Sequence, residues 1–536
     1  MKLRESNIEK MQSRTFDVLI VGGGINGAVC ASSLTSRGAS VALIDRGDFS
    51  SFTSQESSNL VWGGIKYLET LEFGLVRKLC VARNHLIKSY PSNVKEIRFF
   101  VTLQKGFRHN RLFLFCGALL YWFIGAFFTR APRLLSRKAI QAEEPVVDIS
   151  SSPGGFEYSD AFLIDNDARF VFKFIRAAMD HGGIVGNYLE SAGSRREGDL
   201  WVTEVRDLIG NRSFQIRSKV LINACGPYVD QHNQLSGEQT EHHHLFSKGI
   251  HLLVDRVTPQ RRVLTFFADD GRLFFVIPMG NKSCIGTTDT RVEELPARVT
   301  EEDRQFVLRN INKLLKLDPP LNEGHIIAER CGVRPLVVEA RPKKRDTGDW
   351  TALSRKHAIE ANREHRIVSI FGGKLTDCLN VGNEVAAEVR ALGIEMPFYN
   401  IRWYGEPPRQ VKEEFYHQAR LMNLDAMTAP TSSEALSRRF WRRYGAAAFN
   451  LLEDIRNDPA MGELLIEGTE YIRCELYHAA RREMVTRLED FLRRRSKIAL
   501  QVRTETIRGA PGLAEACEIL FGEDGPAQIR RYFDEH

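Results

Sequence analysis

Residues 16–45 read FDVLIVGGGINGAVCASSLTSRGASVALID, and this stretch decides the fold of the chain. The apolar run over residues 16–21 is typical of a buried parallel strand, and it stops at a glycine turn. Residues 28–36 predict a helix of small residues, and SVALID predicts a second strand that ends at Asp45. Strand, glycine turn, helix and strand in this order predict one βαβ unit.

Three glycines of the turn, Gly22, Gly24 and Gly27, fit the pattern G-x-G-x-x-G. The first permits a tight turn, the second lets a pyrophosphate approach the backbone, and the third lets the helix pack closely on the strand. The helix then presents free N–H groups and its positive dipole end to the phosphates. Asp45, about twenty residues further on, is placed to accept hydrogen bonds from an adenosine ribose. We predict a dinucleotide site, with a glycine turn of another α/β protein as the alternative; the motif leaves NAD and FAD open.

Composition limits the other classes of function. With 536 residues, of which 43% are hydrophobic, the chain is long enough for a large core and two or three domains. The net charge of +6 is small for this length, so nucleic acid is not expected as a partner. Nine scattered cysteines without a Cys-x-x-Cys pair indicate reduced thiols rather than disulfides or a metal site. The polar first fourteen residues lack the apolar stretch of a secretory signal, which predicts a cytoplasmic location.

Residues 53–69, TSQESSNLVWGGIKYLE, are first rich in hydroxyl groups and then rich in glycine. The stretch resembles the FAD-dependent, quinone-linked glycerol-3-phosphate dehydrogenases of the D-amino-acid-oxidase-like flavoprotein superfamily. Further matches follow in the order of that family: GFEYSD (155–160), NACGP (223–227), IGTTD (285–289), GVRPL (332–336), FGGKLT (371–376) and EMVTRLEDFL (483–492). The resemblance therefore extends over about residues 16–500, and it implies FAD rather than NAD.

The resemblance implies an α/β (α+β) fold with three parts. Residues 16–404 would hold a discontinuous Rossmann-like FAD-binding domain and an interleaved substrate domain with an antiparallel sheet. Residues 405–536 would form a C-terminal helical domain, and the glycine and paired prolines at 405–408 mark its start. Residues 1–15 are expected as a polar N-terminal tail.

The reaction that the resemblance implies is hydride transfer from C2 of sn-glycerol 3-phosphate to flavin N5, with the electrons passed on to a membrane quinone. Arg334 and Lys374 would be catalytic, because positive charge near the C2 oxygen favours alkoxide character. Both would also bind substrate, together with Lys66, Tyr67 and Arg355 at phosphate-contacting positions. The implied cofactor-binding residues are Gly22, Gly24, Ile25, Asn26, Gly27, Asp45, Thr53, Ser54, Ser57, Ser58, Gly226, Gly373, Lys374, Leu375 and Thr376.

Several residues depart from the family pattern, and they cluster where substrate is expected. Trp62 stands where the family usually has histidine, and Lys66 where it has arginine. Tryptophan cannot act as a general base, and lysine lacks the bidentate fork of arginine. Gln55 and Glu56 replace small or basic residues, and residues 377–379 read Asp-Cys-Leu instead of threonine, tyrosine and arginine. The cofactor site is therefore expected intact and the substrate site remodelled.

These departures leave the proton acceptor and the substrate open. The acceptor is either another group, such as His251, or a water held by Lys374. The substrate is glycerol 3-phosphate or, in the alternative, a different hydroxy acid, polyol phosphate or amine. A flavin-binding protein without turnover is the third interpretation, and a homodimer is compatible with each.

Residues 112–128, LFLFCGALLYWFIGAFF, carry no charge and are flanked by arginines. A helix of this length spans about 26 Å, short of the roughly 30 Å hydrocarbon core. A crossing would also separate the two halves of the FAD-binding domain. We therefore predict a helix peripheral to the cytoplasmic membrane, with Tyr121, Trp122 and Phe123 in the interface, near a quinone. A buried core helix is the alternative.

Three further patterns are expected to be structural. His242, His243 and His244 are predicted in a polar surface loop rather than a metal site. Residues 438–443, RRFWRR, are predicted as a solvated helix face with buried aromatics. Near-helical spacing predicts core positions at Leu476, Ala480, Met484, Leu488 and Phe491.

Overall fold

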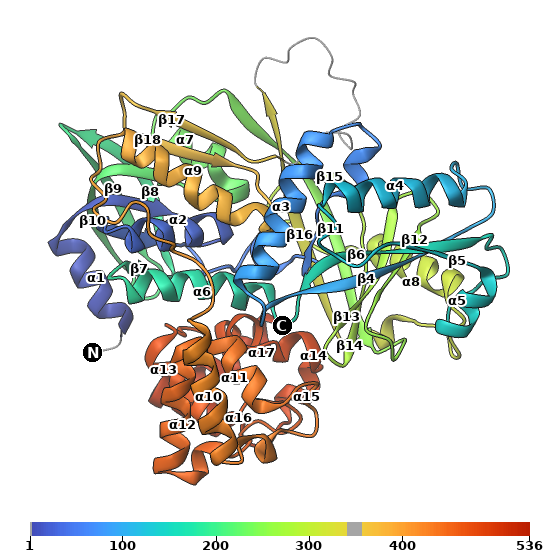
Figure 1. Cartoon of the computed structure of the whole chain (residues 1–536). Helices are drawn as coiled ribbons and strands as arrows, with labels where there is room; N and C mark the ends of the chain where they lie inside the picture. Colours follow the sequence, from blue (N-terminus) through green and yellow to red (C-terminus); the bar gives the residue numbers. More distant parts are fainter. Residues whose placement is uncertain (1–2, 340–355) are drawn as a thin grey trace.

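The computed structural model describes residues 3–339 and 356–536. Figure 1 shows two sheets side by side and a layer of helices, in orange and red, packed beneath them. The first sheet carries the glycine turn, the second is mainly antiparallel, and the helical layer is C-terminal. The expected fold class is confirmed.

The first sheet has eight strands drawn from three separate parts of the chain. Its main path runs β17-β18-β10-β1-β2-β7, and all neighbours are parallel except the edge strand β17. Its strands are β1 (Thr15–Val21), β2 (Val41–Ile44), β7 (Ile184–Gly186), β8 (Leu189–Glu197), β9 (Leu200–Asp207), β10 (Arg212–Asn223), β17 (Ala358–Asn362) and β18 (Ile367–Phe371). The domain is thus discontinuous, because strands far apart in sequence pair in space.

Helix α2 (Ile25–Ser36) joins β1 to β2 and completes the predicted βαβ unit. Every residue of α2 after Ile25 is buried, since α6 (Asp167–Asp180) and α9 (Cys378–Ala391) both pack against it. The small side chains of this helix allow that close packing. α7 (Val229–Leu235) follows the turn after β10.

Residues 3–13 form a helix, α1 (Leu3–Ser13), where the sequence was expected to be a polar tail. α1 packs near β7 and β10, and its Ile8 and Met11 are fully buried against the sheet. Arg4 donates to the backbone of Asn187 at 3.0 Å. Burial of Ile8 and Met11 and the hydrogen bonds of Arg4 and Asn7 therefore dock this segment on the sheet.

The second sheet has ten strands in the order β15-β11-β14-β13-β12-β4-β6-β3, with β16 beside β11 and β5 beside β6. All pairs are antiparallel except β12 with β4. Its strands are β3 (Leu60–Val61), β4 (Val94–Leu103), β5 (Arg133–Leu135), β6 (Gly154–Leu163), β11 (His242–Asp255), β12 (Val263–Phe267), β13 (Leu273–Met279), β14 (Lys282–Gly286), β15 (Thr290–Val292) and β16 (Ala328–Glu339).

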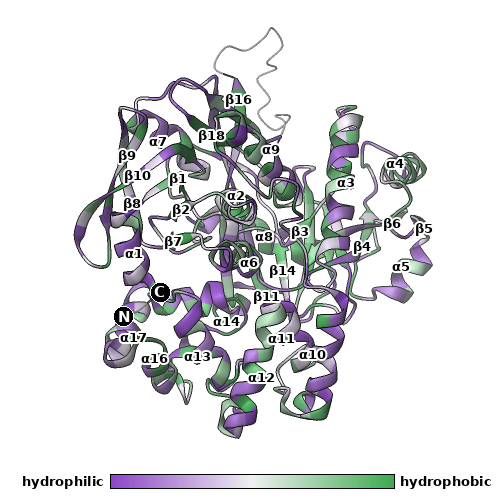
Figure 2. Ribbon diagram, turned by 60° about the vertical axis from the view of Figure 1, so that its left-hand side comes forward, coloured by the Kyte–Doolittle hydropathy of each residue, from purple (hydrophilic) through white to green (hydrophobic). Residues whose placement is uncertain are grey.

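Four helices accompany the second sheet: α3 (Phe73–Ser89), α4 (Arg111–Ile124), α5 (Arg137–Glu143) and α8 (Glu301–Leu314). α8 contributes to a core with β11 and β12, and α3 and α4 to another. Figure 2 shows α4 as a largely hydrophobic helix at the edge of the molecule. No helix in the described part of the chain is long and apolar enough to span a bilayer.

The C-terminal layer is built from helices alone. They are α10 (Arg409–Leu421), α11 (Leu436–Tyr444), α12 (Ala448–Asn457), α13 (Arg473–Arg482), a π-helix (Asp490–Arg495), α14 (Ile498–Gln501), α15 (Thr504–Arg508), α16 (Leu513–Phe521) and α17 (Gly525–Glu535). Four of the five predicted core positions, Leu476, Met484, Leu488 and Phe491, are buried, and Ala480 is partly buried.

At residues 438–443 the predicted buried aromatics, Phe440 and Trp441, are confirmed, but the prediction of a solvated arginine face was wrong. Arg439, Arg442 and Arg443 of α11 are buried. Arg443 pairs with Asp165 at 2.9 Å, and Arg442 pairs with the same carboxylate. Asp165 lies just before α6, so these arginines join the C-terminal helices to the first sheet's domain, a partner that local sequence does not reveal.

Candidate cofactor and substrate site

The glycine turn between β1 and α2 leaves no room for side chains at two positions. Gly22 has φ +107°, and a Cβ there would lie 2.4 Å from the carbonyl oxygen of Ala224. A Cβ on Gly27 would lie 1.8 Å from the carbonyl oxygen of Gly22. Both positions therefore require glycine, the first for its backbone conformation and the second for helix–strand contact.

Gly24 differs, because a Cβ there would meet only the hydroxyl of Ser54, at 3.2 Å. It caps α2 without a side-chain hydrogen bond. Ser54 accepts from the amide of Ile25 at 3.0 Å. The open helix N-terminus provides N–H groups and positive potential for a phosphate.

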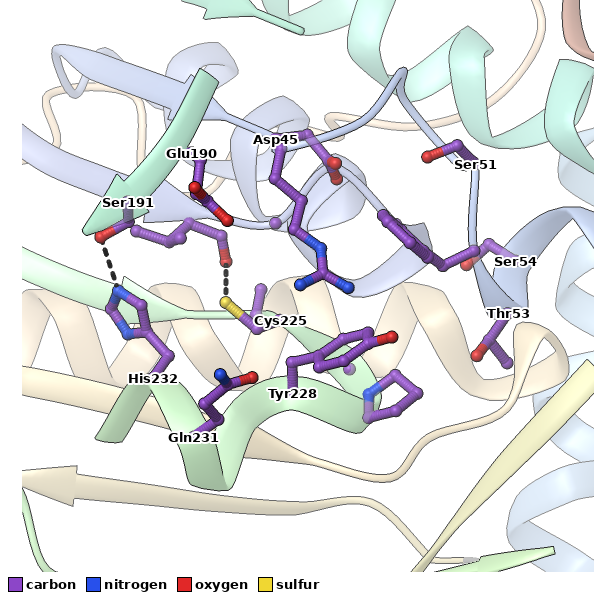
Figure 3. A pocket seen from close by; sticks show the side chains of 18 of the residues that line it. Asp45, Ser51, Thr53, Ser54, Glu190, Ser191, Cys225, Tyr228, Gln231 and His232 are labelled. Atoms are coloured by element: carbon purple, nitrogen blue, oxygen red, sulfur yellow. Dashed lines mark hydrogen bonds between the residues drawn. The ribbon is translucent and has the colours of Figure 1, made fainter. Parts of the chain in front are cut away.

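Asp45 is buried directly after β2 and binds the glycine turn. Its carboxylate accepts from the amide of Gly23 at 2.6 Å and from the amide of Gly47 at 2.8 Å. Burial raises the pKa of Asp45 to about 6, and these hydrogen bonds only partly oppose the rise. Asp45 also lines the cavity described next (Figure 3). Its contact with a ribose stays a prediction.

A cavity of about 140 Å³ begins at the glycine turn and passes Asp45 to reach α7. Thr53, Ser54, Tyr228 and His232 line it (Figure 3). The Arg46 guanidinium lies 3.8 Å from the ring centroid of Tyr228. This cavity combines glycine backbone, a helix N-terminus and an aromatic wall. That combination fits the nucleotide half of a dinucleotide.

The predicted cofactor residues fall into two groups around this cavity. Gly22, Gly24, Asp45, Thr53, Ser54 and Gly226 line it. Gly226 has φ +58°, and a Cβ there would face open space. Ile25, Asn26, Gly27, Ser57, Ser58, Gly373, Lys374, Leu375 and Thr376 do not line it.

Part of the second group gathers at the other end of the turn. The side-chain amide of Asn26 donates to the carbonyl of Gly372 at 3.0 Å. Its buried Oδ1 has no hydrogen-bond partner among the described residues, and a Cβ on Gly373 would lie 3.1 Å from it. Thr376 donates to the carbonyl of Trp62 at 3.2 Å. The FGGKLT turn, the helix N-terminus and the WGG turn thus meet, which suits the flavin half of FAD.

Two predicted substrate residues also come together. The Nζ of Lys374 lies 2.5 Å from the hydroxyl of Tyr67, in a 3-10 helix (Ile65–Leu68). Lys66, in the same turn, is exposed. Arg355 lies outside the described residues. Of these predicted substrate residues, the structure therefore brings Tyr67 and Lys374 into contact.

Arg334 is oriented by the IGTTD segment. On β16, its guanidinium donates to the Thr287 hydroxyl at 2.9 Å and to the Asp289 carboxylate at 3.3 Å. A Cβ on Gly249 of the neighbouring strand would lie 2.0 Å from Arg334 Nη2, so glycine makes space for the guanidinium. Nearby, Thr53 donates to the carbonyl of Val333 at 3.0 Å. The hydroxyl-rich loop is therefore attached to the strand that carries Arg334.

His251 is an unfavourable proton acceptor. Burial, together with the charges of Arg334 and Arg330, lowers its pKa to about 3. A group whose protonated form is so disfavoured is a weak base at neutral pH. Of the two acceptors considered from the sequence, His251 is therefore disfavoured, and a water held by Lys374 stays a prediction.

A buried network that holds the backbone of Gly63 was not predicted from the sequence. The carboxylate of Asp160 accepts from the amide of Gly63 at 3.1 Å, from the hydroxyl of Tyr121 at 2.7 Å and from Arg83 at 3.2 Å. Tyr121 is buried, so the prediction that it faces lipid was wrong, because its hydroxyl binds Asp160. Trp62 Nε1 donates to Tyr158 at 3.2 Å. The sequence signal for this network was Asp160, an acidic residue within GFEYSD, a segment that forms a buried strand.

Two histidines also have roles that the sequence did not reveal. The prediction of a loop at residues 242–244 was wrong, because β11 begins at His242. His244 is buried, and its Nε2 accepts from the amide of Gly372 in the FGGK turn at 3.0 Å. His357 donates to Asp377 at 3.0 Å and to Glu384 at 2.6 Å. Asp377, one of the departures noted above, therefore has a partner.

His357 and Lys374 line one small cavity of about 70 Å³ with Lys78 and Lys356. Burial would lower the pKa of His357, but the hydrogen bonds to Asp377 and Glu384 outweigh it and raise that pKa to about 9. His357 is thus a cation at neutral pH beside the catalytic lysine predicted from the sequence.

Comparison with known proteins agrees with this geometry. A family model described as "FAD dependent oxidoreductase" matches residues 17–352, and one described as "C-terminal domain of alpha-glycerophosphate oxidase" matches residues 411–524.

Two curated relatives are similar over nearly the whole chain. Glycerol-3-phosphate dehydrogenase 2 of Mycobacterium tuberculosis is 29% identical over 96% of this chain and 86% of its own length. Glycerol-3-phosphate dehydrogenase of Pseudomonas aeruginosa is 29% identical over 91% of this chain and 93% of its own. A solved structure, glycerol-3-phosphate dehydrogenase from Bacillus halodurans complexed with FAD, has a TM-score of 0.70 at 22% identity, covering 100% of this chain and 97% of that chain.

Proposed function

Because this chain belongs to the family of FAD-dependent oxidoreductases and is an FAD enzyme, we propose that it oxidises sn-glycerol 3-phosphate to dihydroxyacetone phosphate. The two curated relatives with that activity in their names align with almost the full chain, C-terminal helices included. The observation that carries the proposal is the contact of Lys374 with Tyr67, which gathers a cation and a hydroxyl beside the FGGK turn. Bound FAD would supply the hydride acceptor.

The protein's own groups would position and activate the alcohol. Arg334, held in place by Thr287 and Asp289, and Lys374 would stabilise negative charge on the C2 oxygen. The phosphate would be bound by Lys66 and Tyr67, with Arg355 as a further cation. The proton of the hydroxyl group on C2 would leave to a water near Lys374, while the hydrogen on C2 would leave as hydride.

The test is anaerobic addition of sn-glycerol 3-phosphate to the purified flavoprotein. We expect the absorbance of oxidised flavin at about 450 nm to bleach. sn-Glycerol 1-phosphate and glycerol are the matched controls, because they change the stereochemistry at C2 or remove the phosphate. No bleaching at millimolar sn-glycerol 3-phosphate would remove the proposal and leave FAD binding untouched.

One observation favours a second candidate. Trp62 is fixed by its hydrogen bond to Tyr158 and has no basic atom. A pocket with this wall could take a different hydroxy acid, polyol phosphate or amine. Bleaching by such a compound, and not by sn-glycerol 3-phosphate, would identify this alternative, and bleaching by none would support a flavoprotein without turnover.

We also propose that α4 rests on an anionic membrane surface and that a membrane quinone receives the electrons. Large apolar side chains project into solvent along it, with Phe113 61% and Phe123 62% exposed, and only Ala118 and Tyr121 of the helix are buried. This exposure contradicts the alternative of a buried core helix. Arg108 and Arg130, which flank the helix in sequence, are exposed, and Arg108 pairs with Glu69 at 2.8 Å. Cations at these positions suit headgroup phosphates.

A further inference from the structure

Three consecutive arginines of the C-terminal π-helix reach the loop that carries the hydroxyl-rich cofactor residues. Arg494 pairs with Asp48 at 2.8 Å, and Arg495 binds both oxygens of Asp48 at 2.7 and 2.8 Å. Asp48 is fully buried three residues after Asp45. The start of the loop is thus held from a segment more than four hundred residues away.

The third arginine, Arg493, binds the middle of the same loop. Its Nη2 donates to the carbonyl of Gln55 and to the carboxylate of Glu56, both at 3.0 Å. Arg493 is 8% exposed, and in the described part of the chain all hydrogen bonds of its side chain end on this loop. Gln55 and Glu56 are the two residues that depart from the family pattern in the loop.

Glu56 connects Arg493 to the strand that carries Arg334. Its second carboxylate oxygen accepts from the amide of Cys331 at 3.2 Å. A Cβ on Gly332 would lie 2.9 Å from the backbone oxygen of Glu56, so the loop lies directly on β16 at this point. Glu56 therefore joins the C-terminal helices, the cofactor loop and the catalytic strand through one side chain.

The charges around Glu56 offset only part of the cost of burying its carboxylate. Burial raises the pKa of Glu56, and the guanidinium of Arg493, together with that of Arg330, opposes the rise. A buried carboxylate that loses a guanidinium partner is strongly disfavoured, so the loop has to shift or take up a proton. Either change would move the hydroxyl groups of Thr53 and Ser54, which lie two or three residues away.

We propose that Arg493 is a positioning residue for FAD, acting through Glu56. By holding Glu56 against β16, Arg493 sets the position of the loop relative to the open N-terminus of α2 and to Arg334. The C-terminal helical domain thereby takes part in cofactor binding without touching the cofactor. The proposal rests on FAD binding and not on the substrate, so failure of the glycerol 3-phosphate test leaves it standing.

The experiment compares purified Arg493→Gln, Glu56→Gln and the double variant with the wild-type holoenzyme. FAD affinity is measured from flavin fluorescence released on dilution, the flavin environment from visible circular dichroism, and stability from the melting temperature. The control is Arg503→Gln. Arg503 also joins the C-terminal helices to the second sheet's domain, through the carbonyls of Gly324 and Ile326 at 2.9 and 2.8 Å, but does not contact the loop.

We expect Arg493→Gln to weaken FAD binding on the order of tenfold and to change the visible dichroism, whereas Arg503→Gln changes only the melting temperature. The double variant should bind FAD about as well as Arg493→Gln, because both changes break the same link. Arg493→Lys should restore part of the affinity, since it retains the charge. Wild-type affinity in Arg493→Gln, or losses that add in the double variant, would overturn the proposal.

Discussion

The Nζ of Lys374 lies 2.5 Å from the phenolic oxygen of Tyr67, although 307 positions separate the two residues in sequence. The same Nζ is 4.1 Å from the centroid of the Tyr67 ring. A lysine side chain in these contacts brings a cationic group to the place where the substrate oxygen is proposed to bind.

Replacing Lys374 by methionine should abolish this charge with little change in volume. We expect kcat/KM for sn-glycerol 3-phosphate to fall about a hundredfold or more, because stabilisation of developing negative charge is lost. Tyr67→Phe should cost about tenfold, mostly in KM. Steady-state kinetics on samples of equal FAD content make the measurement. Lys78→Met, which changes another lysine of the same small cavity, is the control, and equal losses in both lysine variants would contradict a specific role for Lys374.

Gly24 and Gly27 should respond differently to substitution. A side chain at Gly27 would collide with the carbonyl of Gly22, so Gly27→Ala should lower the free energy of unfolding by more than about 2 kcal/mol. A Cβ at Gly24 would meet only the Ser54 hydroxyl in the protein, so we expect Gly24→Val to fold but to lose FAD. Urea unfolding and the flavin spectrum separate the two effects. Normal flavin content in Gly24→Val would argue against pyrophosphate binding at this turn.

Charges on the exposed face of α4 should weaken membrane binding. We expect Phe113→Asp with Phe123→Asp to lower partitioning onto vesicles containing phosphatidylglycerol by about tenfold or more, because two aromatic anchors are removed. Co-sedimentation measures it. Leu421→Asp, at a leucine that is 74% exposed at the end of α10, is the control. If Leu421→Asp lowers partitioning onto vesicles as much as the double variant does, α4 is not the docking helix.

His357 should make stability depend on pH in the alkaline range. Its folded-state pKa is raised from 6.5 to about 9 by Asp377 and Glu384, which outweigh burial. The stabilisation is therefore fully present below pH 6.5 and is lost as pH rises through 9, a change of roughly 3 kcal/mol. Urea midpoints between about pH 6 and pH 10 measure it.

His357→Gln is the matched variant for this prediction. It should be less stable at pH 6.5 and show a flatter dependence at higher pH, because glutamine carries no titrating charge. Lys78, Lys356 and Lys374 line the same cavity and remain unchanged in the variant. The same alkaline slope in wild type and variant would contradict the assignment of the effect to His357.

The parts of the fold that were predicted correctly depend on short-range physics. The apolar run of β1, the turn at Gly22 and the small residues of α2 each restrict the backbone within a few positions, so they could be read locally. The failures share the opposite property. The arginines of α11 were predicted to face solvent and Tyr121 the membrane interface, but they pair with Asp165 and Asp160 inside the protein.

The sequence by itself determined the βαβ unit, the dinucleotide turn and, through motifs in family order, the flavoprotein class. Tertiary structure alone decided which polar side chains contact one another: Lys374 and Tyr67, His357 and Asp377, Arg493 and Glu56. The physical reason is range. Backbone conformation and hydrophobic periodicity act between near neighbours, whereas a buried charge is stabilised by whichever partner the fold brings within about 3 Å, wherever that partner lies in the chain.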